Sequence, residues 1–595
     1  MPFGLSPDQA IIFSLLIAVF GLLIWGRWRY DLIAFGALVV ALLTGVVPVD
    51  KAFSGFGHPA TVIVALVLIL SRGLSNAGVI ELASRWIVGS GRSLIAHIGL
   101  MSGVSAALSA MMNNVAALAL LMPIDLEAAA KAKRSAALTL MPLSFATILG
   151  GMVTLIGTPP NIIVASFRAD ALGSPFGMFD FAPVGGVTAI AGVLFVALIG
   201  WRLLPAARSK QEAPQDLFKL ENYIAELTVG EDSESAGKKL SELKESLAES
   251  EAEILGLLRN GRRFAARAAT KIKPGDILVL QGGPDAIEKA AGTLNLDYGE
   301  DAAQPERLKD DEMELLEVVV PSGSRAERRS AQSLGLRWRH GVTLLGVARE
   351  GKPFRERLRR LTLQAGDVLL LLAPQQQHSA VLNWLGSLPL ASRGLRMMQR
   401  EKAGLAIAAF AIAIAAASFG LVYLPVALAA VAVLYAFLRI VPPSQLYESV
   451  EWPVIVLLGA MIPIGQALES TGGTALLADG LVALSWGYPP VVALALLMIV
   501  TMTLSDVINN TATAVIAAPI ALGTAKSLDV NPDAFLMAVA VAASCAFLTP
   551  IGHKNNTIIL GPGGYRFGDY WRMGLPLEIL VIAVSLPMIL LVWPL

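Results

Sequence analysis

Two pairs of adjacent asparagines lie in apolar parts of this chain. The segment NNVAALALLMPI begins at Asn113, and NNTATAVIAAPI begins at Asn509. A serine precedes each pair by four residues, Ser109 in the first case and Ser505 in the second. An asparagine side chain offers both donors and an acceptor, and a hydroxyl one helical turn away can reach the same place. These groups could bind a cation and an anion together.

Two further motifs interrupt apolar segments. They are Gly157-Thr158-Pro159-Pro160-Asn161 and Thr549-Pro550-Ile551-Gly552-His553, and the second is followed by Asn556. A broken helix inside a membrane leaves backbone groups that protein or a wet cavity must satisfy. Helix N-termini attract anions, whereas unwound carbonyls suit a hard cation such as sodium. The motifs therefore predict two unwound helices at an ion site, with Asn161 and Asn556 in supporting positions.

The same motifs belong to an internal repeat. VPVDKAFSGFGHP from Val47 aligns with VPPSQLYESVEWP from Val441, an offset of 394 residues. The asparagine pairs are offset by 396 residues, and Asn161 and Asn556 by 395. An inverted repeat with broken helices at corresponding positions is typical of a secondary transporter.

Composition separates a membrane part from a soluble insert. The 595 residues are 55% hydrophobic and only 15% charged. Of the 92 charged residues, 56 lie between positions 206 and 398. This pattern predicts a polytopic membrane protein with one soluble insert. The zero net charge does not suggest a nucleic-acid partner, and the single cysteine, Cys545, excludes a disulfide within the chain.

The apolar segments predict an α-helical membrane fold in two halves, residues 1–205 and 399–595. Stretches 93–124 and 488–521 are too long for one helix, so we expect each to be a re-entrant hairpin with an asparagine pair at its tip. Single spans of about 20 residues are expected at ten further places. These are 9–25, 31–48, 58–75, 139–167, 182–204, 402–419, 422–440, 453–469, 534–560 and 574–594.

Five spans in each half require the halves to insert in opposite orientations. The excess of lysine and arginine in short loops then marks the cytoplasmic side. It places Arg27, Arg72, Arg134 and Lys554 in the cytoplasm together with the insert, residues 206–398. Both termini are expected outside a cytoplasmic membrane, and the lipid bilayer is the first partner.

The insert contains two similar units, at 206–300 and 301–398. ILGLLRNG from Ile254 matches LLGVAREG from Leu344, and PGDILVL from Pro274 matches AGDVLLL from Ala365. Alternating apolar residues predict short strands, so we expect an α+β fold. The units resemble the C-terminal regulatory domain (TrkA-C) of potassium-uptake proteins. That resemblance implies either a scaffold or a sensor of a small-molecule or nucleotide regulator.

The membrane part resembles the divalent anion/sodium symporter family. Asn113-Asn114-Val115 and Asn509-Asn510-Thr511 resemble its Ser-Asn-Thr motifs, and TPPN from Thr158 resembles its second signature. The segment from Phe547 to Pro576 resembles the end of members with a regulatory insert. The resemblance implies an elevator-type homodimer that carries a small inorganic or dicarboxylate anion with Na⁺ as coupling ion.

The resemblance also implies a role for individual residues. One sodium site would use Ser109, Asn113, Asn114 and Gly157, and the other Ser505, Asn509, Asn510 and Gly552. The anion would meet Asn114, Thr158, Asn510 and Thr511, with His553 at the position that matches Thr158. Val115 departs from the family's threonine and cannot donate a hydrogen bond, which favours a compact anion.

We therefore expect a sodium-coupled symporter of a divalent anion, with sulfate first and a dicarboxylate second. Two alternatives stay open: a proton-coupled exporter or antiporter, in which Asp506 would be essential, and an ion channel gated by the insert. A channel requires a filter-lined pore, and no filter motif is evident. No Ser-His-Asp, metal or phosphate-loop arrangement suggests an enzyme.

Overall fold

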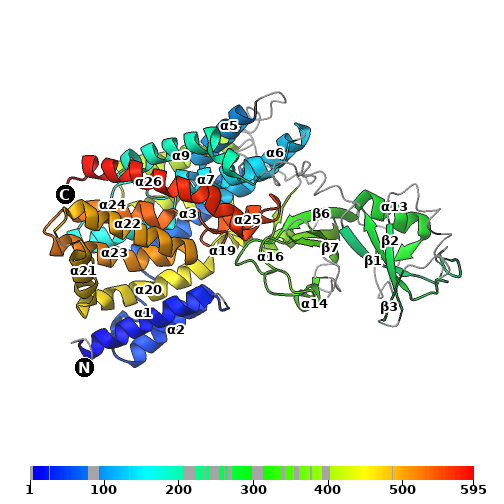
Figure 1. Ribbon diagram of the computed structural model, residues 1–595, viewed down its shortest axis with the longest axis horizontal. Helices are drawn as coiled ribbons and strands as arrows, with labels where there is room; N and C mark the ends of the chain where they lie inside the picture. The colour runs from blue at the N-terminus through cyan, green and yellow to red at the C-terminus, as the bar shows by residue number, and fades with distance from the viewer. Residues whose placement is uncertain are drawn as a thin grey trace.

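A computed structural model describes most of the chain. In the apolar parts it describes residues 5–25, 27–77, 93–132, 134–205, 402–485 and 487–595. In the insert it describes 223–231, 233, 235–239, 243, 253–259, 262–265, 271–282, 284–297, 313–336, 342–349, 352–353, 361–374 and 378–390. Figure 1 shows a bundle of helices at one end of the molecule and two β-sheets at the other.

The first half of the chain contributes eight long helices to the described part of the bundle. They are α1 (Pro7–Trp25), α2 (Tyr30–Leu43), α3 (Pro59–Asn76), α5 (Leu94–Ser109), α6 (Asn114–Lys131), α7 (Ala137–Gly151), α8 (Pro159–Leu172) and α9 (Val187–Leu198). Several of these helices begin at residue types that favour a helix N-terminus. His58 and Ser93 cap α3 and α5 with their side chains, and Pro59 and Pro159 stand where a missing N–H costs nothing.

The second half follows the same order. It contains α17 (Ala403–Ser418), α18 (Leu424–Phe437), α19 (Pro443–Glu448), α20 (Trp452–Ser470), α21 (Gly473–Leu484), α22 (Pro490–Val507), α23 (Asn510–Ser527), α24 (Pro532–Ser544), α25 (Lys554–Leu560) and α26 (Tyr570–Val592). The helix pair α5–α6 corresponds to α22–α23, and α7–α8 corresponds to α24–α25. An inversion between the halves stays a prediction.

The two interrupted segments differ from the expected spans in where they break. The helix of segment 139–167 ends at Gly151 and resumes at Pro159, and that of 534–560 ends at Ser544 and resumes at Lys554. The breaks therefore begin several residues before the motifs that predicted them. Asn161 and Asn556 lie in the first turns of the resumed helices, because Thr158 and His553 are the capping residues.

Five described helices are long and apolar enough to cross a membrane: Pro7–Trp25, Pro59–Asn76, Trp452–Ser470, Pro490–Val507 and Phe567–Val592. Other expected spans are shorter helices; α2 and α18, for example, have 14 residues each. At 1.5 Å per residue such a helix covers only about 21 Å. Helix α21 was not anticipated, because its segment contains Asp479 and several glycines.

The most buried helices are α7 and α24. Every described residue of α24 from Asp533 to Ser544 is buried. In contrast, the outer helices expose large apolar side chains, among them Leu43, Phe437 and Leu591, each more than 70% exposed. The broken helices thus lie at the centre of the bundle, and the apolar surface faces outward, as a bilayer requires.

The insert contains two five-stranded antiparallel sheets. The first has the order β3-β2-β4-β1-β5 and the second β10-β6-β9-β7-β8. Their strands are β1 (Tyr223–Val229), β2 (Glu253–Arg259), β3 (Arg262–Ala265), β4 (Ile277–Gly282) and β5 (Leu296–Asp297), then β6 (Met313–Val319), β7 (Thr343–Arg349), β8 (Lys352–Pro353), β9 (Val368–Pro374) and β10 (Leu388–Pro389). The central strands β2, β4 and β1 of the first sheet correspond in their pairing to β7, β9 and β6 of the second. The second sheet, which includes β6 and β7, is nearer the helices (Figure 1).

An arginine–aspartate pair is repeated in the two sheets. Arg259 Nε donates to Asp276 Oδ1 at 2.7 Å, and Arg349 Nε donates to Asp367 Oδ1 at the same distance. The hydrogen bond to Asp276 raises the pKa of Arg259. The glycine before each aspartate, Gly275 or Gly366, has a positive φ that favours glycine. The likeness to TrkA-C regulatory domains stays a prediction.

Candidate functional site

The first asparagine of each pair caps the helix that follows it. Asn113 Oδ1 accepts a hydrogen bond from the Val115 N–H at 2.8 Å. Asn509 Oδ1 accepts one from the Thr511 N–H at the same distance. The two tips are therefore built alike, and one role of Asn113 and Asn509 is local: each satisfies a free N–H at a helix start.

The second asparagine of the first pair faces inward. The Ser109 hydroxyl donates to Asn114 Oδ1 at 2.6 Å, and Asn114 is only 5% exposed. Its Nδ2 atom lies 3.3 Å from Nε2 of His553, in the break between α24 and α25. Asn114 thus connects the first tip to the broken helix of the second half.

The ring of His553 is held by its other nitrogen. Nδ1 accepts from the Asn555 N–H at 3.1 Å, so a neutral ring carries its proton on Nε2. An Nε2–H requires an acceptor, which the amide oxygen of Asn114 provides if the amide is turned over. Ser109 then accepts from the amide nitrogen, because a hydroxyl can serve either way. Each group in this contact then has a hydrogen-bond partner while the His553 ring stays neutral.

The second tip differs from the first. Asn510 Oδ1 accepts from the Thr511 N–H at 2.8 Å, within its own helix start. The Ser505 hydroxyl donates to the Ala543 carbonyl at 2.6 Å, which directs it toward α24. The structure therefore brings Ser109 to its asparagine pair, whereas Ser505 bonds to the neighbouring broken helix.

Each break is held by the asparagine that follows it. Asn161 Nδ2 donates to the Thr154 carbonyl at 2.8 Å, and Asn556 Nδ2 donates to the Ala546 carbonyl at 2.8 Å. Close packing requires glycine at both breaks. A Cβ on Gly157 would lie 2.4 Å from the Gly151 carbonyl oxygen, and one on Gly552 would lie 2.7 Å from that of Ser505.

Two threonines join the tips to the breaks. Sequence reasoning included Thr549 in the second motif without giving it a role, and it missed Thr154. The Thr154 hydroxyl donates to the Ala110 carbonyl, and the Thr549 hydroxyl donates to the Asp506 carbonyl, both at 2.5 Å. The segments TLIG from Thr154 and TPIG from Thr549 carry this match. A closer comparison of the two breaks could have found it.

The two halves of the chain are also connected through α7 and α25. Asn555 Nδ2 donates to the Thr147 hydroxyl at 2.6 Å and to the Asn114 carbonyl at 3.2 Å. The Ser144 hydroxyl donates to Asn556 Oδ1 at 2.9 Å. None of Asn555, Thr147 and Ser144 was identified from the sequence. Thr147 and Ser144 lie among apolar residues of α7 without a spacing signal, and Asn555 was passed over beside Asn556.

Two buried oxygens near the first break have no hydrogen-bond partner within the described residues. They are Thr158 Oγ1 and Asn161 Oδ1, and both residues are only 1% exposed. Nearby, Asn113 and Gly157 line a small cavity with the apolar residues Val64, Val67, Leu68 and Ile162. The Thr158 hydroxyl suits either a hard monovalent cation or an anion to which it can donate, whereas the Asn161 amide oxygen only accepts and therefore suits a cation. Where the structure is described, no group of three or more His, Cys, Asp or Glu residues could hold a metal ion.

Asp506 lies beside the second break. Its Oδ1 atom accepts from the Leu548 N–H at 2.8 Å, and its Oδ2 atom has no partner in the described part of the chain. Glu578 of α26 is only 7% exposed, and its Oε1 atom likewise has no partner among the described residues. Sequence reasoning singled out Asp506 and missed Glu578, which lies in the terminal helix far from any motif.

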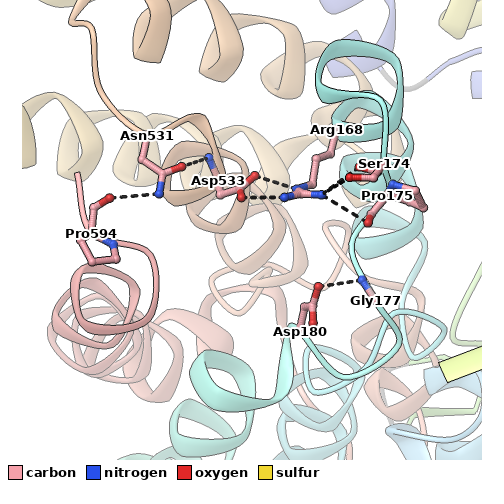
Figure 2. Close-up of polar contacts among 8 residues, drawn as sticks. All are labelled: Arg168, Ser174, Pro175, Gly177, Asp180, Asn531, Asp533 and Pro594. Carbon is pink, nitrogen blue, oxygen red and sulfur yellow. Dashed lines mark hydrogen bonds and ion pairs between the residues drawn. The ribbon is translucent and has the colours of Figure 1, made fainter. Parts of the chain in front are cut away.

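An ion pair joins α8 to the start of α24 (Figure 2). Arg168 Nε donates to Asp533 Oδ1 at 2.7 Å, and Nη2 donates to Oδ2 at 2.9 Å. Arg168 also donates to Ser174 and lies over the Phe176 ring. The Asn531 amide donates to the Pro594 carbonyl at 3.0 Å, which connects the start of α24 to the end of the chain. The pair holds the resumed helix of the first half against the first helix of the second break.

The sequence profile of the citrate transporter family (CitMHS) matches residues 20–535 and 494–595. The chain belongs to this family. It is 31% identical, over 98% of both chains, to an uncharacterized transporter of Synechocystis. It is 30% identical to the uncharacterized transporter YfbS of Escherichia coli, over 98% of this chain and 99% of that one.

A third relative has a more specific description. The sodium/sulfate cotransporter 2 of Chlamydomonas reinhardtii is 26% identical over 62% of this chain, which corresponds to 44% of the algal protein. This CitMHS member is thus a transporter, and its several apolar helices place it in a membrane. The expectation of a membrane transporter is confirmed at that level.

Proposed function

We propose that this CitMHS transporter is a sodium-coupled symporter that carries sulfate by alternating access. The observation that carries the proposal is the contact between Asn114 and His553, because it joins the polar tip of one half to the broken helix of the other. The description of the algal relative as a sodium/sulfate cotransporter supports the choice of ions. A dicarboxylate is the second candidate substrate.

The anion would bind between the two tips. Helices α6 and α23 begin at Asn114 and Asn510, and their N-termini present backbone N–H groups and partial positive charge. Helix α8 adds the dipole of its N-terminus, although Pro159 and Pro160 have no N–H. The hydroxyls of Thr158 and Thr511 would add donors, and His553 would donate its Nε2–H to the anion in place of Asn114. The Val115 side chain has no hydrogen-bond donor, so the first half offers the anion fewer contacts. This favours a compact tetrahedral anion.

Sodium would bind to neutral oxygens on each side of the anion. In the first half, Ser109, Asn113, Asn114 and Gly157 would form the site, and the free oxygens of Thr158 and Asn161 lie in the same break. In the second half, Ser505, Asn509, Asn510 and Gly552 would form it. The bound cation adds positive charge where the anion must lie, so the two ions stabilise each other's binding and transport is coupled.

The moving unit would contain the helix pairs α5–α6 and α22–α23 with the broken helices. The remaining helices would form a scaffold in a homodimer in the cytoplasmic membrane. Both termini would lie outside, and the insert would lie inside as a possible receptor for a small-molecule or nucleotide regulator.

A proton-coupled exporter or antiporter is the second candidate. Its specific support is that Asp506 and Glu578 are buried carboxyls, and one oxygen of each has no partner among the described residues. Intramembrane carboxylates are usually functional. In that case Asp506→Asn would abolish transport and sodium would be dispensable.

Uptake by purified protein in proteoliposomes tests the proposal. We expect saturable uptake of radiolabelled sulfate that requires an inward sodium gradient and is reduced by unlabelled sulfate. Competition by succinate would assign the dicarboxylate instead. Uptake that follows a proton gradient without sodium would favour the second candidate, and a non-saturating current would indicate a channel.

A further inference from the structure

The second sheet domain, residues 313–390, contacts the first helices of the bundle at two places. Arg328 Nη1 donates to the Arg27 carbonyl at 2.6 Å, in the loop between α1 and α2. Arg72 Nη2, in the last part of α3, donates to Asn383 Oδ1 at 3.1 Å. Asn383 belongs to α16 (His378–Leu385) of the second domain. The domain is thus attached to α1–α3.

The same domain contacts the broken helix of the second half. A Cβ on Gly561, directly after α25, would lie 2.1 Å from the Gly366 carbonyl oxygen. A Cβ on Gly366 would lie 3.3 Å from Leu560 Cδ2. The turn before β9 therefore touches the end of α25 with backbone against backbone. Val368, which follows this turn, is part of the buried apolar core of the helix bundle.

These two sets of contacts join parts that must separate during transport. Helix α25 begins at Lys554, directly after Gly552 and His553, so it belongs to the unit that would carry the ions. Helices α1–α3 would belong to the scaffold. A rigid domain that holds both cannot keep all its contacts when one moves past the other.

We propose that residues 313–390 act as a brake, which holds α25 against α1–α3 and slows the transport cycle until it is released. The proposal rests on the proposed function, because it assumes that α25 moves relative to α1–α3. The hydrogen bonds of Arg72 and Arg328 are exposed, so each contributes little. The specific contact is the close approach of Gly366 and Gly561.

Strand β9 offers a route by which the brake could be controlled. Val368 packs into the helix bundle, whereas Leu370, two residues later, packs into the core of the first sheet domain. Alternate residues of a strand point to the same face, so one face of β9 contacts both neighbours. A ligand that shifts the first domain would therefore bias the contact at α25, provided that its affinity differs between the two positions.

Substitution of one glycine tests the contact between α25 and the turn before β9. Gly561 has φ −68° and ψ −58°, which alanine adopts without strain, so Gly561→Ala disturbs only the approach of the Gly366 carbonyl. Gly568→Ala is the matched control, because a Cβ there meets nothing within 4 Å. We expect Gly561→Ala to speed sodium-driven sulfate uptake by full-length protein about five-fold, the factor that corresponds to the weakening of one modest interaction. Gly568→Ala should transport at the parent rate.

A second readout does not depend on the substrate. Val67 of α3 lines the cavity beside Asn113 and Gly157, so a Val67→Cys reporter in a Cys545→Ser background senses movement of the first tip. Its maleimide labelling rate should change in Gly561→Ala and not in Gly568→Ala. Unchanged labelling in Gly561→Ala would overturn the brake. If the parent carries sulfate, altered labelling with unchanged or slower uptake would overturn it as well.

The maleimide labelling rate also distinguishes failure of the brake from failure of the proposed function. If the parent carries no sulfate but Gly561→Ala still alters labelling, the proposed substrate is wrong and the brake stands. If Gly561→Ala does not fold, Val368→Ala removes an apolar side chain of the insert from the same contact and must alter labelling in the same direction. Val368→Ala without any change would then overturn the brake.

Discussion

Asn161 and Asn556 make the same two hydrogen bonds, each to carbonyls seven and ten residues earlier in the chain. Asn161 Nδ2 lies 2.8 Å from the Thr154 oxygen and 3.5 Å from that of Gly151. Asn556 Nδ2 lies 3.1 Å from the Thr549 oxygen and 2.8 Å from that of Ala546. Each resumed helix thus fixes the unwound carbonyls before it, which no helical N–H can satisfy.

Loss of this amide should destabilise the protein. Asn161→Ala and Asn556→Ala each leave buried carbonyls unpaired, at a cost of about 2 kcal/mol. Asn161→Asp and Asn556→Asp keep the size but lose the donor, so they should be at least as harmful. Thermal unfolding in detergent measures the effect. An aspartate variant as stable as the parent would show that donation to the break is unimportant.

The hydroxyl of Thr158 gives a test that separates binding from stability. It has no partner in the described structure, so Thr158→Val removes no protein hydrogen bond and should leave the unfolding temperature at or above the parent value. If the hydroxyl binds the anion, the KM for sulfate should rise about ten-fold. An unchanged KM would remove Thr158 from the site.

Thr147→Val is the matched control for this substitution. The Thr147 hydroxyl accepts from Asn555 Nδ2 at 2.6 Å, so its loss leaves this buried amide with only its longer bond, to the Asn114 carbonyl at 3.2 Å. We expect lower stability, by about 1–3 kcal/mol, without the specific rise in KM. If both valine variants behaved alike, the absence of a protein partner at Thr158 would have no functional meaning.

Val115 tests the preference for a compact anion. Val115→Thr introduces a hydroxyl at the start of α6, at the position that corresponds to Thr511 in the second half. We expect a lower KM for a dicarboxylate and a smaller ratio of sulfate to succinate uptake. Thr511→Val should act in the opposite direction. A ratio that moves in neither variant would indicate that these positions do not contact the anion.

The sequence predicted the local features of this site better than its long-range contacts. The asparagine pairs indicated both tips, and the glycines and prolines of the two interrupting motifs indicated both breaks. Each of these signals lies within a short segment of the sequence. It did not predict that Asn555 bonds to Thr147, since nothing in the spacing of α7 and α25 specifies their contact. It placed Ser505 with Asn510 by analogy with Ser109, whereas burial against α24 gave Ser505 a carbonyl partner.

The breaks show why boundaries were less certain. Glycines and prolines mark where a helix cannot continue, but α7 ends at Gly151, several residues before Gly157. Apart from Thr154, the intervening residues 152–156 are apolar. The Asn161 side chain bonds to the carbonyls of Gly151, Met152 and Thr154. A tertiary hydrogen bond of this kind overrides the local preference for helix.

The ion pair in Figure 2 should contribute to stability through its burial. The Arg168 and Asp533 side chains are 18% and 10% exposed, so removal of one partner leaves a poorly solvated charge. We expect Asp533→Asn or Arg168→Met to cost about 3 kcal/mol, and the double variant to cost less than the sum of the two. Thermal unfolding of the three variants measures the coupling. Additive losses would show that the pair is not energetically linked.

His553 has two roles that one substitution can separate. Its Nδ1 atom caps α25 by accepting from the Asn555 N–H, and its Nε2 atom contacts Asn114. His553→Asn retains a capping oxygen but is too short to reach the first tip, so stability should stay near the parent value while the KM for sulfate rises about ten-fold. His553→Ala should lose about 1 kcal/mol more through the missing cap. If His553→Asn transports sulfate with the parent KM, the contact between the two halves does not form the anion site.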